Sequence, residues 1–279
     1  MTSPTSRTVT VRPASGAADS RTDLAIALQE SGPQSGPQSG RTALVLHGGG
    51  GPGTVANIAA HLAQTHRTLL PTHPGWNGTE RPEWLANVAT LAELYLDLLR
   101  AEGLRDVLLV GSSLGGWAAA EMAARDTEGL VGALVVVDTV GIVVAGLPMT
   151  DFFALDARGV AEHSFHDPER FYVDPASLSD AERAGRVANM AALRALAGDP
   201  YMHDPDLPGQ LASIKVPSQV LWGESDRIAT PEYGRVFAGL IPGSRFQVIE
   251  RAGHLPQLEQ PAVTFAAIDA FLAETESGS

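Results

Sequence analysis

The sequence contains no cysteine among its 279 residues. This absence excludes disulfides, thiolate metal sites and a cysteine nucleophile. The chain also lacks an apolar run of about 18 residues, which a membrane-spanning helix would need. Its first residues lead into no apolar segment of the signal-peptide type. We therefore expect a cytoplasmic protein without a membrane partner.

Basic residues are few relative to acidic ones. The chain has 19 Lys and Arg against 32 Asp and Glu, which gives a formal charge of -13. A field of this sign repels phosphate groups, so it argues against nucleic acid or an anionic membrane surface as a partner. Apolar residues make up 44% of the sequence, which is enough for a full core in one large domain or two modest ones.

Short apolar segments of the strand type alternate with segments of helical spacing along most of the chain. The strand-type segments are 8–11, 24–28, 43–46, 68–70, 107–111, 130–137, 220–223 and 245–249. Strands that are apolar throughout and alternate with helices predict a mainly parallel sheet with helices on both faces. The first two segments are expected to form an antiparallel pair at the sheet edge. Residues 1–6 are expected to be a frayed tail, and 31–40, a Ser-Gly-Pro-Gln repeat, a solvated loop.

The alternation stops between residues 141 and 210. Asp-Pro and Leu-Pro pairs break this stretch into short helical pieces, and it concentrates aromatic residues such as Phe152, Phe165 and Tyr201. From the residues alone it is either a cover over a pocket or a helical appendage with a small core of its own.

A serine at a predicted strand-to-helix turn is the first candidate for chemistry. The apolar run ends at Gly111, Ser113 follows at the apex, and an Ala-rich helical pattern begins after Gly115. A Gly-x-Ser-x-Gly pattern in this context is typical of a strained turn that exposes a nucleophilic hydroxyl. The alternative is an ordinary loop of small residues.

A glycine-rich loop, His47-Gly48-Gly49-Gly50-Gly51-Pro52-Gly53, directly follows the apolar segment 43–46. Its N–H groups are not shielded by side chains, which suits a loop that hydrogen-bonds an incoming oxygen. A phosphate-binding loop is the competing interpretation. The Lys-Ser/Thr ending of such a loop is missing, as is the spacing of a dinucleotide fingerprint.

A serine hydroxyl needs a base to take its proton and a third group to orient that base. Asp226 follows the end of a predicted strand, and His254 lies in the loop between the last strand and the last helix. Asp138 also follows a strand end and is the alternative acid. The other histidines show no metal-ligand spacing, so the sequence indicates neither a metal nor a cofactor.

The chain resembles the α/β-hydrolase superfamily from about Asp23 to the C-terminus. The features that carry this resemblance are the turn at the serine, the glycine loop and the order Ser113, Asp226, His254. The resemblance implies an α/β core domain of residues 1–140 and 211–279, with 141–210 inserted as a helical lid. It also implies that the three residues form a catalytic triad. Their oxyanion hole would use the N–H groups of Leu114 and Gly49, with Gly50 as second choice.

The resemblance indicates the type of reaction better than it indicates the substrate. Serine at the turn argues against haloalkane dehalogenases and epoxide hydrolases, which carry aspartate there. The glycine loop is similar to that of carbon-carbon bond hydrolases of aromatic degradation and of proline iminopeptidases. The former usually have tryptophan after the histidine, where this chain has Leu255. We expect an esterase or lactonase for a small, largely apolar substrate. A meta-cleavage-product type of carbon-carbon hydrolase and a non-catalytic ligand-binding protein are the alternatives.

Overall fold

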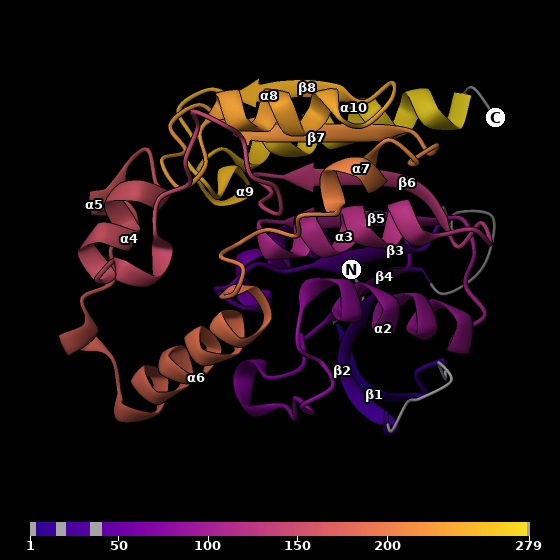
Figure 1. Cartoon of the computed structure of the whole chain (residues 1–279), viewed down its shortest axis with the longest axis horizontal. Coiled ribbons are helices and arrows are strands. Elements are labelled where there is room, and N and C mark those ends of the chain that lie inside the picture. Colours follow the sequence, from indigo (N-terminus) through magenta and orange to yellow (C-terminus); the bar gives the residue numbers. More distant parts are fainter. Residues whose placement is uncertain (1–3, 15–20, 34–40, 278–279) are drawn as a thin grey trace.

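The computed structural model describes residues 4–14, 21–33 and 41–277, and Figure 1 shows a sheet with helices on both of its faces. Most of the loop predicted at 31–40, and residues 1–3 of the predicted tail, lie outside the described residues. Within the described part, no helix is long and apolar enough to span a membrane. The prediction of an α/β fold with a mainly parallel sheet is confirmed.

The described strands form one eight-stranded sheet in the order β1-β2-β4-β3-β5-β6-β7-β8. β1 pairs antiparallel with β2, and β2 pairs antiparallel with β4, whereas all other neighbours are parallel. The strands are β1 (Thr5–Val11), β2 (Leu24–Ser31), β3 (Ala43–Leu46), β4 (Thr68–Pro71), β5 (Val107–Ser112), β6 (Val131–Val137), β7 (Ser218–Gly223) and β8 (Arg245–Ile249). β5 is therefore central, as the sequence predicts.

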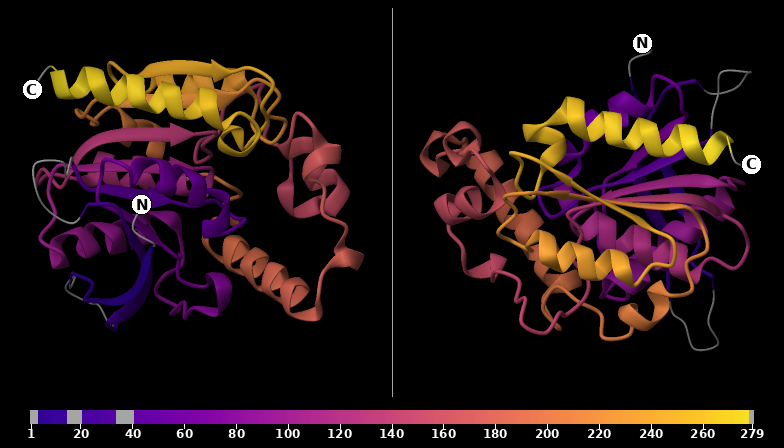
Figure 2. Two further views of the ribbon diagram at one scale, coloured as in Figure 1. Left: turned by 180° about the vertical axis from the view of Figure 1, so that it is seen from behind. Right: turned by 90° about the horizontal axis from the view of Figure 1, so that it is seen from above.

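Helices cover both faces of the sheet (Figure 2), and a hydrophobic core lies on each face. Side chains of α2 (Val88–Ala101), α3 (Leu114–Arg125) and α8 (Pro231–Gly239) contribute to one core. Side chains of α1 (Ala56–Leu62) and α10 (Pro261–Ser277) contribute to the other. The central strands are buried along their whole length because both faces are covered.

The segment between β6 and β7 projects beyond the sheet (Figure 1). Its helices are η3 (Phe152–Ala154), α4 (Ala157–Ser164), α5 (Pro168–Phe171), η4 (Pro175–Ser177), α6 (Asp180–Ala197) and α7 (Leu207–Leu211). A capping box between Ser179 and Glu182 starts α6. The expected boundary at residue 210 falls within α7, which packs against α3 of the core, so the division of the chain into core and lid stays a prediction.

The structure corrects the predicted tail at residues 1–6, because β1 begins at Thr5. The first residues of this strand, Thr5, Ser6 and Arg7, are polar, so the apolar pattern that predicts a strand is absent there. Thr5 and Ser6 pair with Glu30 and Gln29 of β2, and Arg7 forms an ion pair with Glu30. Backbone pairing and charge therefore extend a strand whose side-chain pattern is polar.

Candidate active site

Ser113 lies at the turn between β5 and α3. Its backbone has φ 55° and ψ -120°, a strained conformation for a residue with a side chain. A Cβ atom on Gly115 would lie 2.2 Å from the carbonyl oxygen of Leu46, and one on Gly111 would lie 2.2 Å from that of Gly115. Only glycine fits at either position, so the Gly-x-Ser-x-Gly pattern has a steric cause here.

Ser113, His254 and Asp226 form a continuous chain of hydrogen bonds. Nε2 of His254 lies 2.9 Å from Oγ of Ser113, and Nδ1 of His254 lies 2.8 Å from Oδ2 of Asp226. The Asp226 carboxylate is buried and also accepts the N–H groups of Ile228 at 2.8 Å and Ala229 at 3.2 Å through Oδ1. The acceptor at Nδ1 favours the tautomer that leaves Nε2 free to accept the serine proton.

The loop that carries His254 is tied to the inserted segment. The backbone N–H of His254 donates to the carbonyl of Ser164 at 2.7 Å, at the end of α4. Gly253 N–H donates to Oε2 of Glu259 at 2.6 Å, in the short helix α9 (Pro256–Glu259). The same carboxylate accepts the N–H groups of residues 166–167 at 3.1 and 3.0 Å. Sequence reasoning missed Glu259, because a Glu in a four-residue helix gives no recognisable signal.

The glycine loop after β3 faces the same place. Gly49 and Gly50 line a cavity together with Ser113 and Leu114, and no described residue accepts a hydrogen bond from the N–H of either glycine. Leu114 is the first residue of α3, where a helix leaves its N–H groups without intrahelical partners. These N–H groups are available to an oxygen atom bound beside Ser113.

Two buried histidines hold the base of this loop. His73 N–H donates to Nε2 of His47 at 3.0 Å, so His47 carries its proton on Nδ1 and donates it to the Gly48 carbonyl at 2.7 Å. Nε2 of His73 donates to the carbonyl of His47 at 2.7 Å, and its Nδ1 accepts the Tyr95 hydroxyl at 2.5 Å. Burial lowers the pKa of His73 to about 4 and that of His47 well below its ordinary value. Both rings are therefore neutral near pH 7, and His47 shapes the loop through its hydrogen bond to Gly48.

Asp138, the alternative acid, is also at the site but does not bond to His254. Its Oδ1 accepts the N–H of Gly223 at 2.8 Å. In the described part of the chain, Asp138, Asp226 and His254 form a cluster in which a carboxylate oxygen of each acid and a ring nitrogen lie within 4.8 Å of one another. Both nitrogens of the His254 ring are already engaged by Ser113 and Asp226, which leaves no lone pair directed at a metal.

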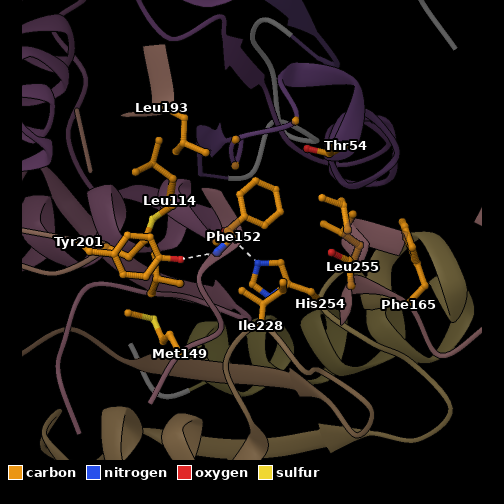
Figure 3. Close-up of a pocket in the computed structure, with 18 residues that line it drawn as sticks. Thr54, Leu114, Met149, Phe152, Phe165, Leu193, Tyr201, Ile228, His254 and Leu255 are labelled. Carbon is orange, nitrogen blue, oxygen red and sulfur yellow. Dashed lines mark hydrogen bonds between the residues drawn. The ribbon is translucent and has the colours of Figure 1, made fainter. Parts of the chain in front are cut away.

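The cavity above Ser113 has a volume of about 140 Å³ and an apolar lining (Figure 3). Among its lining side chains are Val140, Met149, Phe152, Leu193, Ile228 and Leu255. No Lys, Arg, Asp or Glu is among the described residues that line it. A group that enters this space therefore meets hydrocarbon on most sides and His254 at its base.

Tyr201 fixes one wall of the cavity. Its hydroxyl accepts the N–H of Phe152 at 2.7 Å and donates to the carbonyl of Thr150 at 2.7 Å. Figure 3 shows the first of these bonds. The tyrosine hydroxyl is thus hydrogen-bonded to the backbone, and the tyrosine ring adds apolar surface to the cavity wall.

A wider cleft of about 440 Å³ adjoins the cavity and shares Phe152, Val160 and Leu255 with it. This outer cleft also contains polar side chains, Asp156 and Arg186 among them. The inner cavity is therefore apolar, and charge is found only in the outer cleft.

The chain is similar to known proteins in sequence and in fold. A 2-hydroxy-6-oxononadienedioate/2-hydroxy-6-oxononatrienedioate hydrolase of Cupriavidus pinatubonensis is 30% identical over an alignment of 282 positions, gaps included, which covers 91% of this chain and 91% of that protein. A solved carboxylesterase from Bacillus subtilis is 21% identical, with a TM-score of 0.70 over 97% of this chain and 92% of that one. An enol-lactonase from Burkholderia xenovorans LB400 is 19% identical, with a TM-score of 0.70 over 90% and 97%.

The two solved structures share the fold of the chain. The family model that matches residues 43–268 describes the alpha/beta hydrolase family. The match runs from β3 to α10, so it spans the glycine loop, the turn at Ser113, the inserted segment and the loop of His254. The chain belongs to the alpha/beta hydrolase family.

Proposed function

We propose that the protein is a serine hydrolase that cleaves a carboxylic ester or lactone of a small, uncharged, largely apolar substrate through an acyl-enzyme. The observation that carries the proposal is the hydrogen-bonded chain Asp226, His254, Ser113 at the base of a cavity without charged side chains. A buried charge without a partner is costly, so such a cavity disfavours ionised substrate groups.

In the proposed reaction, His254 takes the proton of Ser113 while the serine oxygen attacks the substrate carbonyl carbon. The N–H groups of Leu114 and Gly49, with Gly50 as second choice, stabilise the oxyanion that forms. His254 then gives its proton to the leaving alkoxide, and an acyl-serine remains. Water, deprotonated by His254, attacks the acyl carbon, and the serine oxygen leaves with that proton. No cofactor enters these steps.

The dimensions of the cavity suggest how much of the substrate it takes. A dry cavity of about 150 Å³ holds a molecule of benzene size, so the inner cavity accepts a group of about that size. The remainder of the substrate would extend into the outer cleft. We propose that residues 141–210 act as a lid, since Phe152, Val160 and Leu193 of this segment line the cavity.

A carbon-carbon bond hydrolase is the second candidate, supported by the relative from Cupriavidus pinatubonensis. The name of that relative's substrate describes a dicarboxylate. Binding two carboxylates calls for cationic or strong hydrogen-bond donors, and the inner cavity offers neither Lys nor Arg among its described residues. Arg186, which lines the outer cleft, is a cation that favours this candidate.

A substrate screen separates the candidates. p-Nitrophenyl esters of graded chain length, lactones and a vinylogous diketone carboxylate are compared by kcat/KM, with Ser113→Ala as the blank. Ester or lactone turnover well above diketone turnover supports the proposal, and the reverse order supports the second candidate. A folded protein that turns over none of them, and whose Ser113 does not react with a fluorophosphonate probe, would support a binding protein.

A cavity variant tests whether the substrate occupies the inner cavity. Leu193→Ala enlarges it, so the preferred acyl or alcohol chain is expected to lengthen. Val187→Ala lies on the same helix but is 70% exposed, and it should leave the chain-length profile unchanged. An unchanged profile in Leu193→Ala would contradict this placement of the substrate.

A further inference from the structure

Asp138 occupies an unusual position at the end of β6. Its backbone is in the left-handed region with φ 44°, and its N–H donates to the carbonyl of Leu221 in β7 at 3.0 Å. Oδ1 accepts the N–H of Gly223 at 2.8 Å. The side chain is completely buried. The residue thus joins the ends of β6 and β7 immediately below the loop that carries Asp226.

The second oxygen of this carboxyl group has no hydrogen-bond donor. Oδ2 of Asp138 is buried and receives no N–H or O–H from any described residue. Asp226 lies beside it, and Glu259 adds further negative charge. In the cluster of described residues Asp138, Asp226 and His254, the group that can carry a positive charge is His254, whose Nδ1 is directed at Asp226. An ionised Asp138 would place two negative carboxylates together in the interior.

Asp226 has the opposite surroundings. Its two oxygens accept three hydrogen bonds, from two backbone N–H groups and from the ring of His254. Hydrogen bonds of this kind favour the ionised form of a carboxyl group. The pair is therefore asymmetric, because Asp226 accepts three hydrogen bonds and Asp138 accepts one, at Oδ1.

We propose that Asp138 is a protonated carboxylic acid that donates a hydrogen bond from Oδ2 to the carboxylate of Asp226, and that it acts as a positioning residue for the acid of the triad. The inference rests on the proposed function, because it concerns the same Asp226. Burial, and then the neighbouring charge of Asp226, raise the pKa of Asp138 well above its ordinary value. The pair then carries a single negative charge opposite His254.

This arrangement has two consequences for the reaction. The Asp138 hydroxyl adds a fourth hydrogen bond to the Asp226 carboxylate and so restricts its rotation further. It also withdraws charge density from Asp226, so that the histidine between Asp226 and Ser113 holds its proton less tightly. Asp138 touches neither substrate nor the serine, and it acts through Asp226 alone.

Two substitutions separate this role from the alternatives. Asp138→Asn keeps an N–H donor for Asp226 and an oxygen for the N–H of Gly223, so it should retain kcat/KM within about tenfold. Asp138→Leu keeps a side chain branched at Cγ but removes both bonds, so kcat should fall by roughly 10- to 100-fold. The acid limb of its pH profile for kcat/KM should also move to higher pH. Without the hydrogen bond from Asp138, the Asp226 carboxylate attracts the proton of protonated His254 more strongly.

Other outcomes overturn the proposal. If Asp138 were itself the ionised acid of the triad, Asp138→Asn would lose about 10⁴-fold while Asp226→Asn stayed active. If Asp138 only joined the two strands, neither variant would move the acid limb. Thermal unfolding of both variants shows whether they are folded.

Infrared spectroscopy tests the protonation state without any turnover. The difference spectrum between the protein and Asp138→Asn at pH 8 should contain the carbonyl stretch of a protonated carboxylic acid. Other buried acids such as Glu121 are present in both samples and cancel. A difference spectrum with only carboxylate bands would overturn the proposal, even where Asp138→Leu fails to fold. The infrared signal does not depend on activity. Absence of the carboxylic acid band would therefore refute the role of Asp138, whereas failure of a fluorophosphonate probe to label Ser113 would refute the proposed function.

Discussion

Nε2 of His254 lies 2.9 Å from Oγ of Ser113, although 141 positions separate the two residues in the sequence. The parallel order of β5, β6, β7 and β8 brings them together, because the carboxyl ends of these strands meet at one edge of the sheet. The strained turn at Ser113 and the loop of His254 extend from that edge. The predictions below concern what holds these two side chains in place.

The turn at Ser113 depends on the close approach of α3 to β3. Gly115→Ala should lower the free energy of unfolding by about 3 kcal/mol or more, because its Cβ would meet backbone atoms of Leu46 that cannot move away. Gly53→Ala, where a Cβ meets no atom within 4 Å, should change it by less than about 0.5 kcal/mol. Urea unfolding measures both, and equal stability of the two variants would contradict the packing described.

The buried pair His47 and His73 should make stability depend on pH. The folded-state pKa of His73 is about 4, below its unfolded value of about 6.5. As pH falls through this window the unfolded chain takes up the proton first, so stability present above about pH 6.5 is lost toward pH 4. The contribution of His73 to this loss is on the order of 3 kcal/mol.

His73→Gln cannot titrate, so the difference in its free energy of unfolding between pH 7 and pH 4 should be smaller by about that amount. His203→Gln, which removes a partly exposed histidine, is the matched control and should keep the full pH dependence. A His73→Gln variant whose stability changes with pH as steeply as the parent would show that the buried ring is not neutral.

Glu259 should matter for turnover although it lies outside the cavity. Its carboxylate holds Gly253, next to His254, and also residues 166–167 of the inserted segment. In Glu259→Gln an amide N–H₂ replaces one acceptor and faces backbone donors. We expect kcat to fall by about 10- to 100-fold. Glu250→Gln, at an exposed position of the preceding loop, should have no effect. Equal kcat values in the two variants would remove Glu259 from the support of His254.

Much of the fold and the candidate site follow from local sequence patterns. The apolar segments 43–46 and 107–111 become buried central strands, because a sheet covered on both faces needs apolar residues at every position. Glycines 111 and 115 reveal the turn because no other residue fits there. The positions of Asp226 and His254 could be expected because both follow strand ends.

Other features depend on contacts between distant residues, which a local pattern does not contain. β1 is extended to Thr5 by pairing and by the ion pair of Arg7 with Glu30. Glu259 acquires its partners only when α9 approaches the inserted segment. The choice between Asp138 and Asp226 depends on which side chain reaches Nδ1 of His254, since both follow strands of the same sheet.

Labelling with a fluorophosphonate probe, followed by intact mass and peptide mapping, tests the central claim most directly. The account predicts one label per chain on Ser113, which disappears in Ser113→Ala. Ser112→Ala, which removes the neighbouring buried hydroxyl, should still be labelled. A folded parent protein that takes up no label, or a Ser113→Ala variant labelled as fully as the parent, would contradict the assignment of Ser113 as an activated nucleophile.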